Sequence, residues 1–574
     1  MNDSSFYYEK EVKSQEITSF VTISLVEGGI DMSYFTIEKS YLFIPFELKV
    51  KQKELLNLFL LMLENSGVGN LIQKYVKNDT ELGGRPNCNY YRLFAAILYG
   101  FAFDRFTLRE LEDTFQYDLR YIYLMDSTQV DFTTICKFIN KVIVPNEEEI
   151  FSLIMIQLTK EVGIVLSESD AFIDGTKYQA NANKYKFVWK PTKRHRKLSI
   201  KINDVIERYS LITGFSKDEF ISTNTVVTAL INLKYKKDEL PSKEYKSLEK
   251  FLTATSIKIN EYEEMYKVIG DNRKSFYKTD KDATAMVLKE DYYSKSSYEF
   301  HAAYNVQQLV IRGFIFAYYV SSSRTDIEDF IPINEQFYRL YQCFPKNECA
   351  DAGYGSLDNY TYLDEHHIGN YVKDQSWEGI KSASNPDCYH LLDNDKIVCL
   401  NGLIGIEVEM GNRHHRKKDS VFYKIEGCNN CNWMPFCKRF MRRWDEDFKI
   451  FEVVKKLERY KYQSQDNLCS PKGIELRVNR SIQVEGDFGI IKQNYGYTRV
   501  RRRGIKKVST EIMLTALGLN IAKLIRYYQT GKLNKYWVAP DNLKSEEFKK
   551  PSWKRLAKKG RKIFQQMYEN YYDK

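Results

Sequence analysis

Residues 171–177 read Ala-Phe-Ile-Asp-Gly-Thr-Lys, and they decide how the rest of the chain is interpreted. A short apolar run ends at Asp174 and is followed by a glycine. This pattern predicts a buried strand whose last residue directs a carboxylate into a site. Residues 349–355, Cys-Ala-Asp-Ala-Gly-Tyr-Gly, repeat the pattern and present Asp351. A third acid, Glu485, lies in a stretch that we expect to be helical.

Carboxylates on separate elements are what hard divalent cations such as Mg²⁺ require, because these ions take oxygen ligands. A buried cluster of three acids would repel itself without cations. Two ions about 3.5–4 Å apart can stabilise both the attacking and the leaving oxygen of a phosphoryl transfer. We therefore predict that Asp174, Asp351 and Glu485 converge to hold metals. Any one of them alone could equally be a turn or helix-cap residue.

The contexts of all three acids resemble those of the DDE transposases of bacterial insertion sequences. Residues 172–185 resemble the first-acid motif, residues 350–354 the second, and residues 485–489 with Lys492 the third. The resemblance runs from about residue 83 to about residue 523.

One part of the third motif departs from the family pattern. Some relatives place Tyr and Arg at fixed steps before the Glu, but these positions hold Val478 and Ser481 here. Arg477 and Arg480 lie close to them in the sequence.

The resemblance implies a DNA transposase that uses two Mg²⁺ or Mn²⁺ ions. It would cleave DNA at the ends of the element and join the released 3′-hydroxyl to target DNA. The implied partners are the terminal inverted repeats, the target DNA and a second copy of the chain, since two ends must be brought together. Lys492, seven positions after Glu485, would contact a phosphate near the scissile bond. A nuclease without strand transfer, or an inactive or domesticated DNA-binding protein of the same fold, stays an alternative.

Length and composition agree with a multidomain protein. The 574 residues exceed what one hydrophobic core usually supports, so we expect two or three domains. No secretory signal and no apolar run long enough to span a bilayer is evident, which favours a protein of the bacterial cytoplasm, at the nucleoid, without a membrane partner. Ten cysteines in such a chain indicate reduced thiols.

The predicted fold is an α/β catalytic core of the ribonuclease H-like type, a mixed sheet flanked by helices, with an all-α N-terminal domain. We assign residues 1–165 to a mostly helical DNA-binding domain, although a plain helical packing domain is the alternative. Residues 166–530 would form the catalytic domain. It would contain a helical insertion at about 197–298 and a Cys-rich segment at about 399–440. Residues 531–574 would be a basic tail.

Several local signals are specific enough to be checked. Thr107 and Glu110 have capping-box spacing at the start of a helix, and residues 147–162 have the pattern of another. Residues 300–310 and 311–320 are predicted strands joined at Arg312 and Gly313. Asp326 is interpreted as a helix cap rather than a fourth catalytic acid.

Two basic tracts flank the acid motifs. Residues 193–197 read Lys-Arg-His-Arg-Lys, and residues 501–503 are three arginines. Such tracts can neutralise DNA phosphates, although a charge run is often only a solvated surface. Neighbouring aromatic rings could stack on unpaired bases. The DNA-binding candidates are Lys492, Arg194, Arg196, Lys197, Arg501, Arg502 and Arg503, and the stacking candidates are Tyr185, Trp189, Tyr495 and Tyr497.

Cys428 and Cys431 form a CxxC pair, and Cys437 follows six residues later. Thiolates at this spacing suit a structural Zn²⁺, which takes four ligands. Unbound buried thiols or a redox pair are the alternatives. The candidates for a fourth ligand are Cys399, His414, His415 and Cys469.

Overall fold

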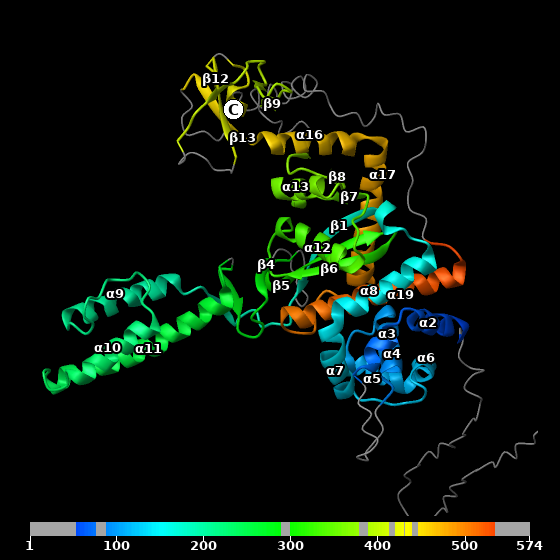
Figure 1. The fold of residues 1–574 in the computed structure, drawn as a ribbon, viewed down its shortest axis with the longest axis horizontal. Coiled ribbons are helices and arrows are strands. Elements are labelled where there is room, and N and C mark those ends of the chain that lie inside the picture. The colour runs from blue at the N-terminus through cyan, green and yellow to red at the C-terminus, as the bar shows by residue number, and fades with distance from the viewer. Residues whose placement is uncertain are drawn as a thin grey trace, which may run out of the picture.

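The computed structural model describes residues 53–75, 88–271, 273–288, 299–377, 389–411, 419–429, 431–438 and 446–533 (Figure 1). His414, His415, residues 1–52 of the predicted N-terminal domain and the tail beyond residue 533 lie outside the described residues.

A six-stranded mixed sheet forms the centre of the catalytic region, with strand order β4-β5-β1-β7-β8 and with β6 also paired to β5. The strands β1 and β6 each pair antiparallel with β5, whereas β7 pairs parallel with β1 and β8 parallel with β7. The strands are β1 (Asp170–Gln179), β4 (Thr284–Val287), β5 (Phe300–Ile311), β6 (Phe314–Ser321), β7 (Asn347–Ala350) and β8 (Gly369–Val372).

The hairpin between β5 and β6 turns at the two residues that the sequence indicated. Arg312 has a φ of 48° and Gly313 a φ of 78°, and positive φ at both central positions matches the right-handed twist of the flanking strands. The helices α12 (Phe330–Tyr341) and α13 (Leu357–Glu365) then pack against β6 and β8, respectively. This alternation confirms the predicted mixed α/β architecture.

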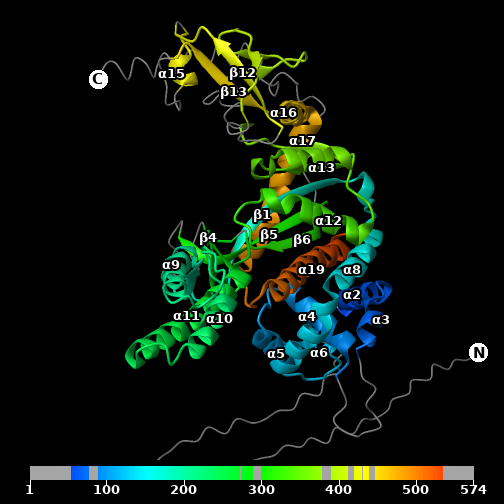
Figure 2. The same cartoon turned by 60° about the vertical axis from the view of Figure 1, so that its left-hand side comes forward.

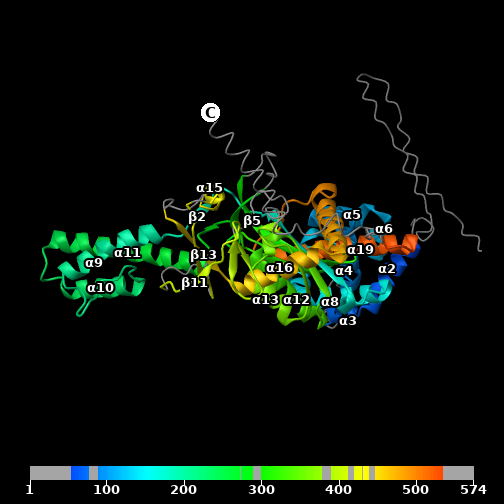
Figure 3. The same ribbon diagram turned by 90° about the horizontal axis from the view of Figure 1, so that it is seen from above.

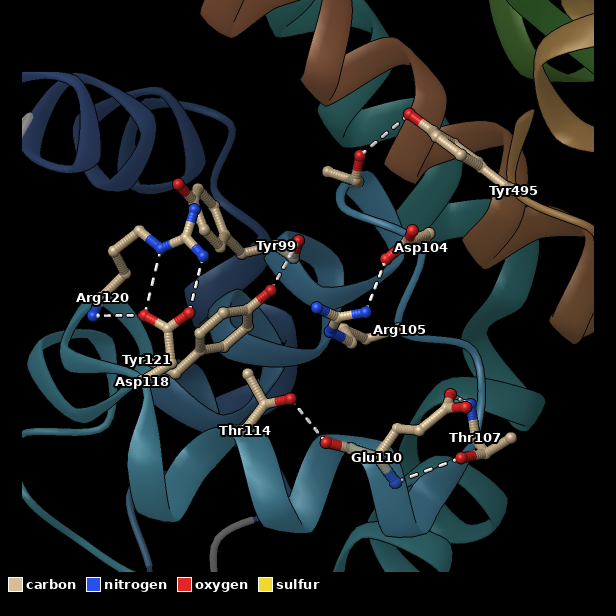
Figure 4. A network of polar contacts seen from close by, with 11 residues as sticks. Tyr99, Asp104, Arg105, Thr107, Glu110, Thr114, Asp118, Arg120, Tyr121 and Tyr495 are labelled. Carbon is tan, nitrogen blue, oxygen red and sulfur yellow. Dashed lines mark hydrogen bonds and ion pairs between the residues drawn. The ribbon is translucent and has the colours of Figure 1, made fainter.

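The N-terminal region is helical. The capping box at Thr107 and Glu110 is present at the start of α5 (Figure 4), and α8 has the predicted bounds. The helices are α2 (Lys53–Asn65), α3 (Val68–Gln73), α4 (Tyr90–Ala102), α5 (Leu108–Tyr117), α6 (Leu119–Leu124), α7 (Phe132–Phe138) and α8 (Glu147–Val162).

The long helix α19 (Ile505–Thr530) joins this region to the sheet, because it packs against both α4 and β6. A Cβ at Gly518 would lie 2.6 Å from the backbone of Phe101, so the glycine permits the close crossing of α19 and α4. By length and composition alone, α19 is apolar enough to cross a membrane, which the sequence analysis did not note. Of its most apolar window, 83% is buried inside the protein, as in a core helix.

The helices α9 (Thr192–Arg208), α10 (Thr223–Tyr235) and α11 (Ser242–Ile269) form an arm that projects from the sheet (Figures 1 and 2). The arm has an apolar core of its own. Helix was expected up to about residue 298, but β3 (Ser275–Tyr277) and β4 follow α11. These short strands are stabilised by partners distant in the sequence, since β3 pairs with β2 (Phe187–Trp189) and β4 with β5.

The Cys-rich region forms a small β unit with its own core. It connects to the sheet through α16 and α17, and Figures 1 and 3 show it at the end of α16. Its elements are β9 (Tyr389–Leu391), β10 (Ile397–Cys399), β11 (Ile406–Val408), β12 (Val421–Glu426), α15 (Met434–Cys437) and β13 (Phe448–Val453), followed by α16 (Lys455–Cys469) and α17 (Pro471–Arg480).

Candidate active site

Asp174 and Asp351 lie on neighbouring parallel strands. Ile173 pairs with Ala350 in the β1–β7 register, so the two acids follow at the same level of the sheet. Asp351 comes directly after β7, as predicted. Asp174 does not end its strand, because β1 continues to Gln179 along β5.

The glycine after Asp174 serves packing rather than termination of the strand. A Cβ at Gly175 would lie 2.4 Å from Oε1 of Gln307 and 2.8 Å from Oδ1 of Asp326. No side chain fits there without displacing these groups. The sequence pattern took the glycine to end the strand, whereas in the structure it makes room for Gln307 and Asp326.

Arg480 connects the first and third acids. Its Nη1 lies 3.0 Å from Oδ2 of Asp174, and its Nη2 donates to Oε1 of Glu485 at 3.0 Å. The guanidinium is 8% exposed, so these ion pairs are shielded from solvent on its side. One buried cation therefore holds together two carboxylates that are 311 positions apart in the sequence.

The position of Glu485 depends on an irregular helix. Residues Ser481–Glu485 form a π-helical turn, η7, between α17 and the short helix α18 (Gly486–Gly489). A π turn closes with i→i+5 hydrogen bonds. Arg480 and Glu485, five residues apart, are thereby brought to the same side. Sequence reasoning noted Arg480 but gave it no role, because regular helical spacing offers no reason to pair residues five apart.

Burial and charge act in opposite directions on the site. Burial raises the pKa of Asp174, and the negative charges of Asp351 and Glu485 add to the increase, whereas Arg480 opposes it. For Asp351, burial also favours the neutral form, but Lys373, a backbone hydrogen bond and Arg480 lower its pKa below the usual value. Lys373 places its Nζ 3.1 Å from Oδ1 of Asp351. The three acids therefore share one electrostatic environment.

The donor set of the site is suited to a hard cation, since it offers three carboxylates and no sulfur. The side chains of Asp351 and Glu485 are 50% and 52% exposed, so two of the acids are accessible from solvent. In the described part of the chain, no three acidic, His or Cys side chains are already arranged as a closed metal site. Arg480 stands between Asp174 and Glu485, and it would have to withdraw for a cation to bridge them.

Lys492 lies further along β1, on the π-helical segment η8 (Ile490–Asn494). Its Nζ donates to Oγ1 of Thr176 at 2.6 Å and to the carbonyl of Lys177 at 2.8 Å, and it lies over the ring of Tyr178. Thr176 and Asp174 are two residues apart on a strand, so they share a face about 7 Å apart. Lys492 therefore contacts the same face of β1 that carries Asp174, two residues further along the strand.

Two family models match the chain. One, described as a transposase DDE domain, matches residues 404–525, and another, described as a transposase domain, matches residues 46–141. Each of the two matched segments is therefore similar to a family of transposase domains. The first match includes Glu485 but neither Asp174 nor Asp351. No curated protein and no solved structure gives a match.

The arginine tract lies beside the far end of β1. The amide of Val500 donates to the carbonyl of Gln179. The buried carboxylate of Glu511 accepts the backbone amides of Arg501 and Arg502, at 2.9 Å each. The backbone of the tract is fixed in this way, while the side chain of Arg501 stays exposed.

A cavity of about 870 Å³ separates this tract from the N-terminal helices. Phe101, Phe106 and Asn140 line one side, and Arg499, Arg501 and Arg502 line the other. The second basic tract lies elsewhere. Arg194, Arg196 and Lys197 are exposed on α9 in the projecting arm, where Arg196 pairs with Glu219 at 3.0 Å.

The stacking candidates differ from one another. Tyr185 and Trp189 are largely exposed. Tyr497 is 1% exposed and donates its hydroxyl to Glu511 at 2.7 Å, so the prediction that it stacks on DNA bases was wrong. Tyr495 donates to the carbonyl of Ala102, which joins the third-acid segment to α4 (Figure 4). Aromatic residues between arginines suggested DNA stacking, but here they pack the interior.

Asp326 belongs to a polar network behind the acids. It stands at the start of the short 3₁₀ helix Ile327–Asp329, but its side chain does not cap it, so the predicted cap was wrong. Its Oδ1 instead accepts hydrogen bonds from Nδ2 of Asn305 at 2.8 Å and from Nε2 of Gln307 at 2.9 Å. The signal for this network is present in the sequence, because Asn305 and Gln307 alternate within the otherwise apolar strand β5.

The cysteines are remote from the acids in sequence position and in fold. Cys399, Cys428, Cys431 and Cys437 line one small cavity in the β unit. Cys469 instead ends α16, next to Asn467, whose side chain bonds the backbone of Asn370 in β8. Of the four proposed fourth ligands, Cys399 is the one that the described structure brings to the CxxC pair.

Proposed function

We propose that this protein is a transposase that cleaves DNA at the ends of an insertion sequence and transfers the released strand into target DNA. Asp174, Asp351 and Glu485 would hold two Mg²⁺ or Mn²⁺ ions. The observation that carries the proposal is the position of Arg480, whose guanidinium is ion-paired to both Asp174 and Glu485 beside Asp351. These acids are distant in the sequence but are grouped around one guanidinium. We expect such a group of carboxylates to hold metal cations in place of the arginine.

The sheet supports a ribonuclease H-like assignment. Three antiparallel strands, β6, β5 and β1, continue into two parallel strands, β7 and β8. In this arrangement the first acid lies on the central strand, and the second follows the strand next to it. The third acid is supplied by a helix that packs against β1.

Each residue has a defined part in the proposed chemistry. Bound divalent ions would lower the pKa of a water nucleophile and stabilise the charge on the leaving oxygen. The three carboxylates bind and orient such ions. Until metal ions bind, the positive charge of Arg480 would balance the charges of Asp174 and Glu485. Lys373 would balance the charge of Asp351 in the same way. Lys492 would hold a DNA phosphate close to the acids.

The DNA path that we propose follows β1 away from the acids. Lys492 contacts Thr176, which lies two residues beyond Asp174 on β1, and the tract at Arg501 lies at the end of the strand. Contacts of Lys and Arg with phosphates give affinity without sequence preference and release counterions. Because two ends must be joined, we propose that the active species is a dimer on DNA.

The test uses a supercoiled plasmid that carries the DNA flanking the coding region on both sides. The wild-type protein should produce nicked and joined products in Mg²⁺ or Mn²⁺. Asp174→Asn, Asp351→Asn and Glu485→Gln should each reduce both products by about a thousandfold, because metal stabilisation is worth several kcal/mol. All three should still bind the DNA in a mobility-shift assay.

The matched control is Glu475→Gln, on the helix that also carries Arg480 but outside the acid cluster. It should retain both products. Metal-dependent cutting without joined products would establish the nuclease alternative. DNA binding by the wild type without any metal-dependent cleavage would refute the enzymatic proposal and favour a DNA-binding role.

A further inference from the structure

Four cysteines from separate segments meet at one small cavity in the β unit. Cys399 ends β10, Cys428 and Cys431 follow β12, and Cys437 ends α15. The cavity is small, with a volume of about 30 Å³.

The backbone around the CxxC pair has the turn that a metal-binding loop requires. Gly427, with a φ of 85°, redirects the chain at the end of β12. The amide of Cys431 then donates to the carbonyl of Cys428 at 3.1 Å, which closes a tight turn. The amide of Trp433 donates to Sγ of Cys431 at 3.4 Å. Both sulfurs are thereby held on the side of the turn that faces the cavity.

The other two cysteines have comparable supports. A second tight turn begins at Cys399, whose carbonyl accepts the amide of Gly402 at 2.9 Å. Lys449, from β13, places its Nζ 3.3 Å from Sγ of Cys437. Burial raises the pKa of Cys428 and of Cys431 above the usual value, so a bound metal would have to displace their protons to give the thiolates that bind metals.

The size of the β unit gives an independent reason for a bound metal. Its apolar core contains few residues, among them Ile397, Tyr423, Ile425 and Phe451. A core this small seldom stabilises a unit by itself, and small domains commonly add disulfides or a structural metal. The four cysteines are present as thiols and not as disulfides, so a metal is the remaining way for them to cross-link the unit.

We propose that Cys399, Cys428, Cys431 and Cys437 bind one structural Zn²⁺ as four thiolates, releasing their protons to solvent. Tetrahedral sites of four cysteines are typical of structural zinc. Within the described residues, no group of candidate ligands has closed coordination geometry. Binding therefore draws the four sulfurs inward to about 2.3 Å from the ion. The sequence left the fourth ligand open, and the shared cavity assigns Cys399.

The bound zinc would stabilise a unit that is attached to the helix leading to the acids. Arg459 of α16 lies 2.5 Å from Asp395 of the unit, and Lys455 lies 3.3 Å from Glu407. After α16 the chain turns at Ser470 and continues as the separate helix α17, which ends at Arg480. The zinc is remote from the reacting atoms, so its role is to maintain structure rather than to catalyse.

The first test measures zinc in the full-length protein, purified without chelator, by inductively coupled plasma mass spectrometry. We expect one zinc per chain. X-ray absorption at the zinc edge should then show four sulfur neighbours at about 2.3 Å. Neither measurement requires a variant that folds. Absence of zinc, or a first shell containing nitrogen or oxygen, would overturn the proposal.

The second test identifies the ligands. Cys399→Ser should lower bound zinc to half or less, and Cys428→Ser should do the same, whereas Cys469→Ser should leave it unchanged as the matched control. Asp174→Asn should also keep its zinc, which separates this site from the proposed catalytic metals. Full retention of zinc in Cys399→Ser would refute the assigned fourth ligand. Rapid alkylation of all four thiols without release of metal would favour unbound cysteines.

Discussion

In the acid site, three oxygen ligands come from β1, the end of β7 and a π-helical turn. In the cysteine cavity, four sulfur ligands come from turns within one small unit. In the acid site a buried arginine bridges two of the ligands, whereas in the cavity a lysine contacts one sulfur. The first arrangement leaves two acids half exposed, while in the second the four cysteines line one small cavity.

The difference separates a site that is suited to exchange its metals from a site that is suited to keep one. Hard ions bound by exposed carboxylates can be replaced and can accept substrate oxygens. Zinc enclosed by four thiolates has no open position for substrate and contributes to folding. On the proposed function, Arg480 would occupy the place of the metals between two acids, whereas Lys449 contacts the sulfur of Cys437 alone.

The largest expected effect concerns the arginine that bridges the acids. Arg480→Ala leaves the buried carboxylate of Asp174 without its cation, which should lower the stability to unfolding by about 2–3 kcal/mol. Adding Mg²⁺ should recover part of this loss, because a metal can replace the guanidinium. Thermal unfolding with and without Mg²⁺ measures both effects.

The control for this prediction lies in the cysteine unit. Lys449→Ala removes a cation from a candidate metal site of the other kind, and its stability should not respond to Mg²⁺. A similar response of the two variants to Mg²⁺ would remove the distinction between the sites.

A second prediction uses Glu348, a buried acid on β7 that the proposed site does not include. Burial raises its pKa to about 8, against a usual value of 4.5. Between these values the folded protein holds a proton that the unfolded chain has lost. Stability from this group is therefore present below about pH 4.5 and is lost as the pH rises toward 8.

Glu348→Gln should remove that dependence and raise the stability at pH 8 by about 2 kcal/mol or more. Urea unfolding of both proteins at pH 5.5 and pH 8 measures it, with Glu475→Gln, at a partly buried acid outside β7, as the control. A variant that loses stability by the same amount at both pH values would show that Glu348 is ionised, and hence closer in behaviour to the site acids.

The third prediction tests the packing behind the acids. Gly175→Ala would place a methyl group against Gln307 and Asp326, and it should cost about 1–3 kcal/mol. Gly486→Ala is the matched control next to Glu485, because no atom lies within 4 Å of the added Cβ, and alanine favours a helix. Chemical denaturation should show a loss for the first variant only. Equal stability of the two variants would mean that Gln307 and Asp326 move to accommodate the methyl group at little cost in stability.

The smallest effect is expected for the ion pair on the projecting arm. Arg196 and Glu219 are both mostly exposed, so Arg196→Ala should change stability by no more than about 0.5 kcal/mol. If the α9 tract binds DNA, the same variant should weaken binding equally for all sequences and reduce its salt dependence. Titrations at two salt concentrations measure this. An unchanged salt dependence would place α9 outside the DNA path.

Much of the local structure could be predicted from sequence, because its signals are local. The bounds of α8, the capping box at Thr107 and the turn at Gly313 all follow from short patterns. The strands β3 and β4 could not be predicted in this way. Each is only three or four residues long and depends on a partner that is far away in the chain.

The candidate site shows the same division. Asp174, Asp351 and Glu485 lie in sequence motifs that can be recognised. The residues that contact them in the folded protein, such as Arg480, do not lie in such motifs. Cys399 could not be selected from four candidates, because only the folded unit brings it to the CxxC pair. The network at Asp326 likewise requires knowledge of which face of β5 is turned toward Gly175.

An additional residue in an α-helix normally rotates everything after it by about 100°, which would separate side chains that must meet. The wider turn at Ser481–Glu485 absorbs such a residue, so that Arg480 still reaches Glu485 at 3.0 Å. The pitch of this single turn, together with the sequence spacing, therefore sets which acid the arginine reaches.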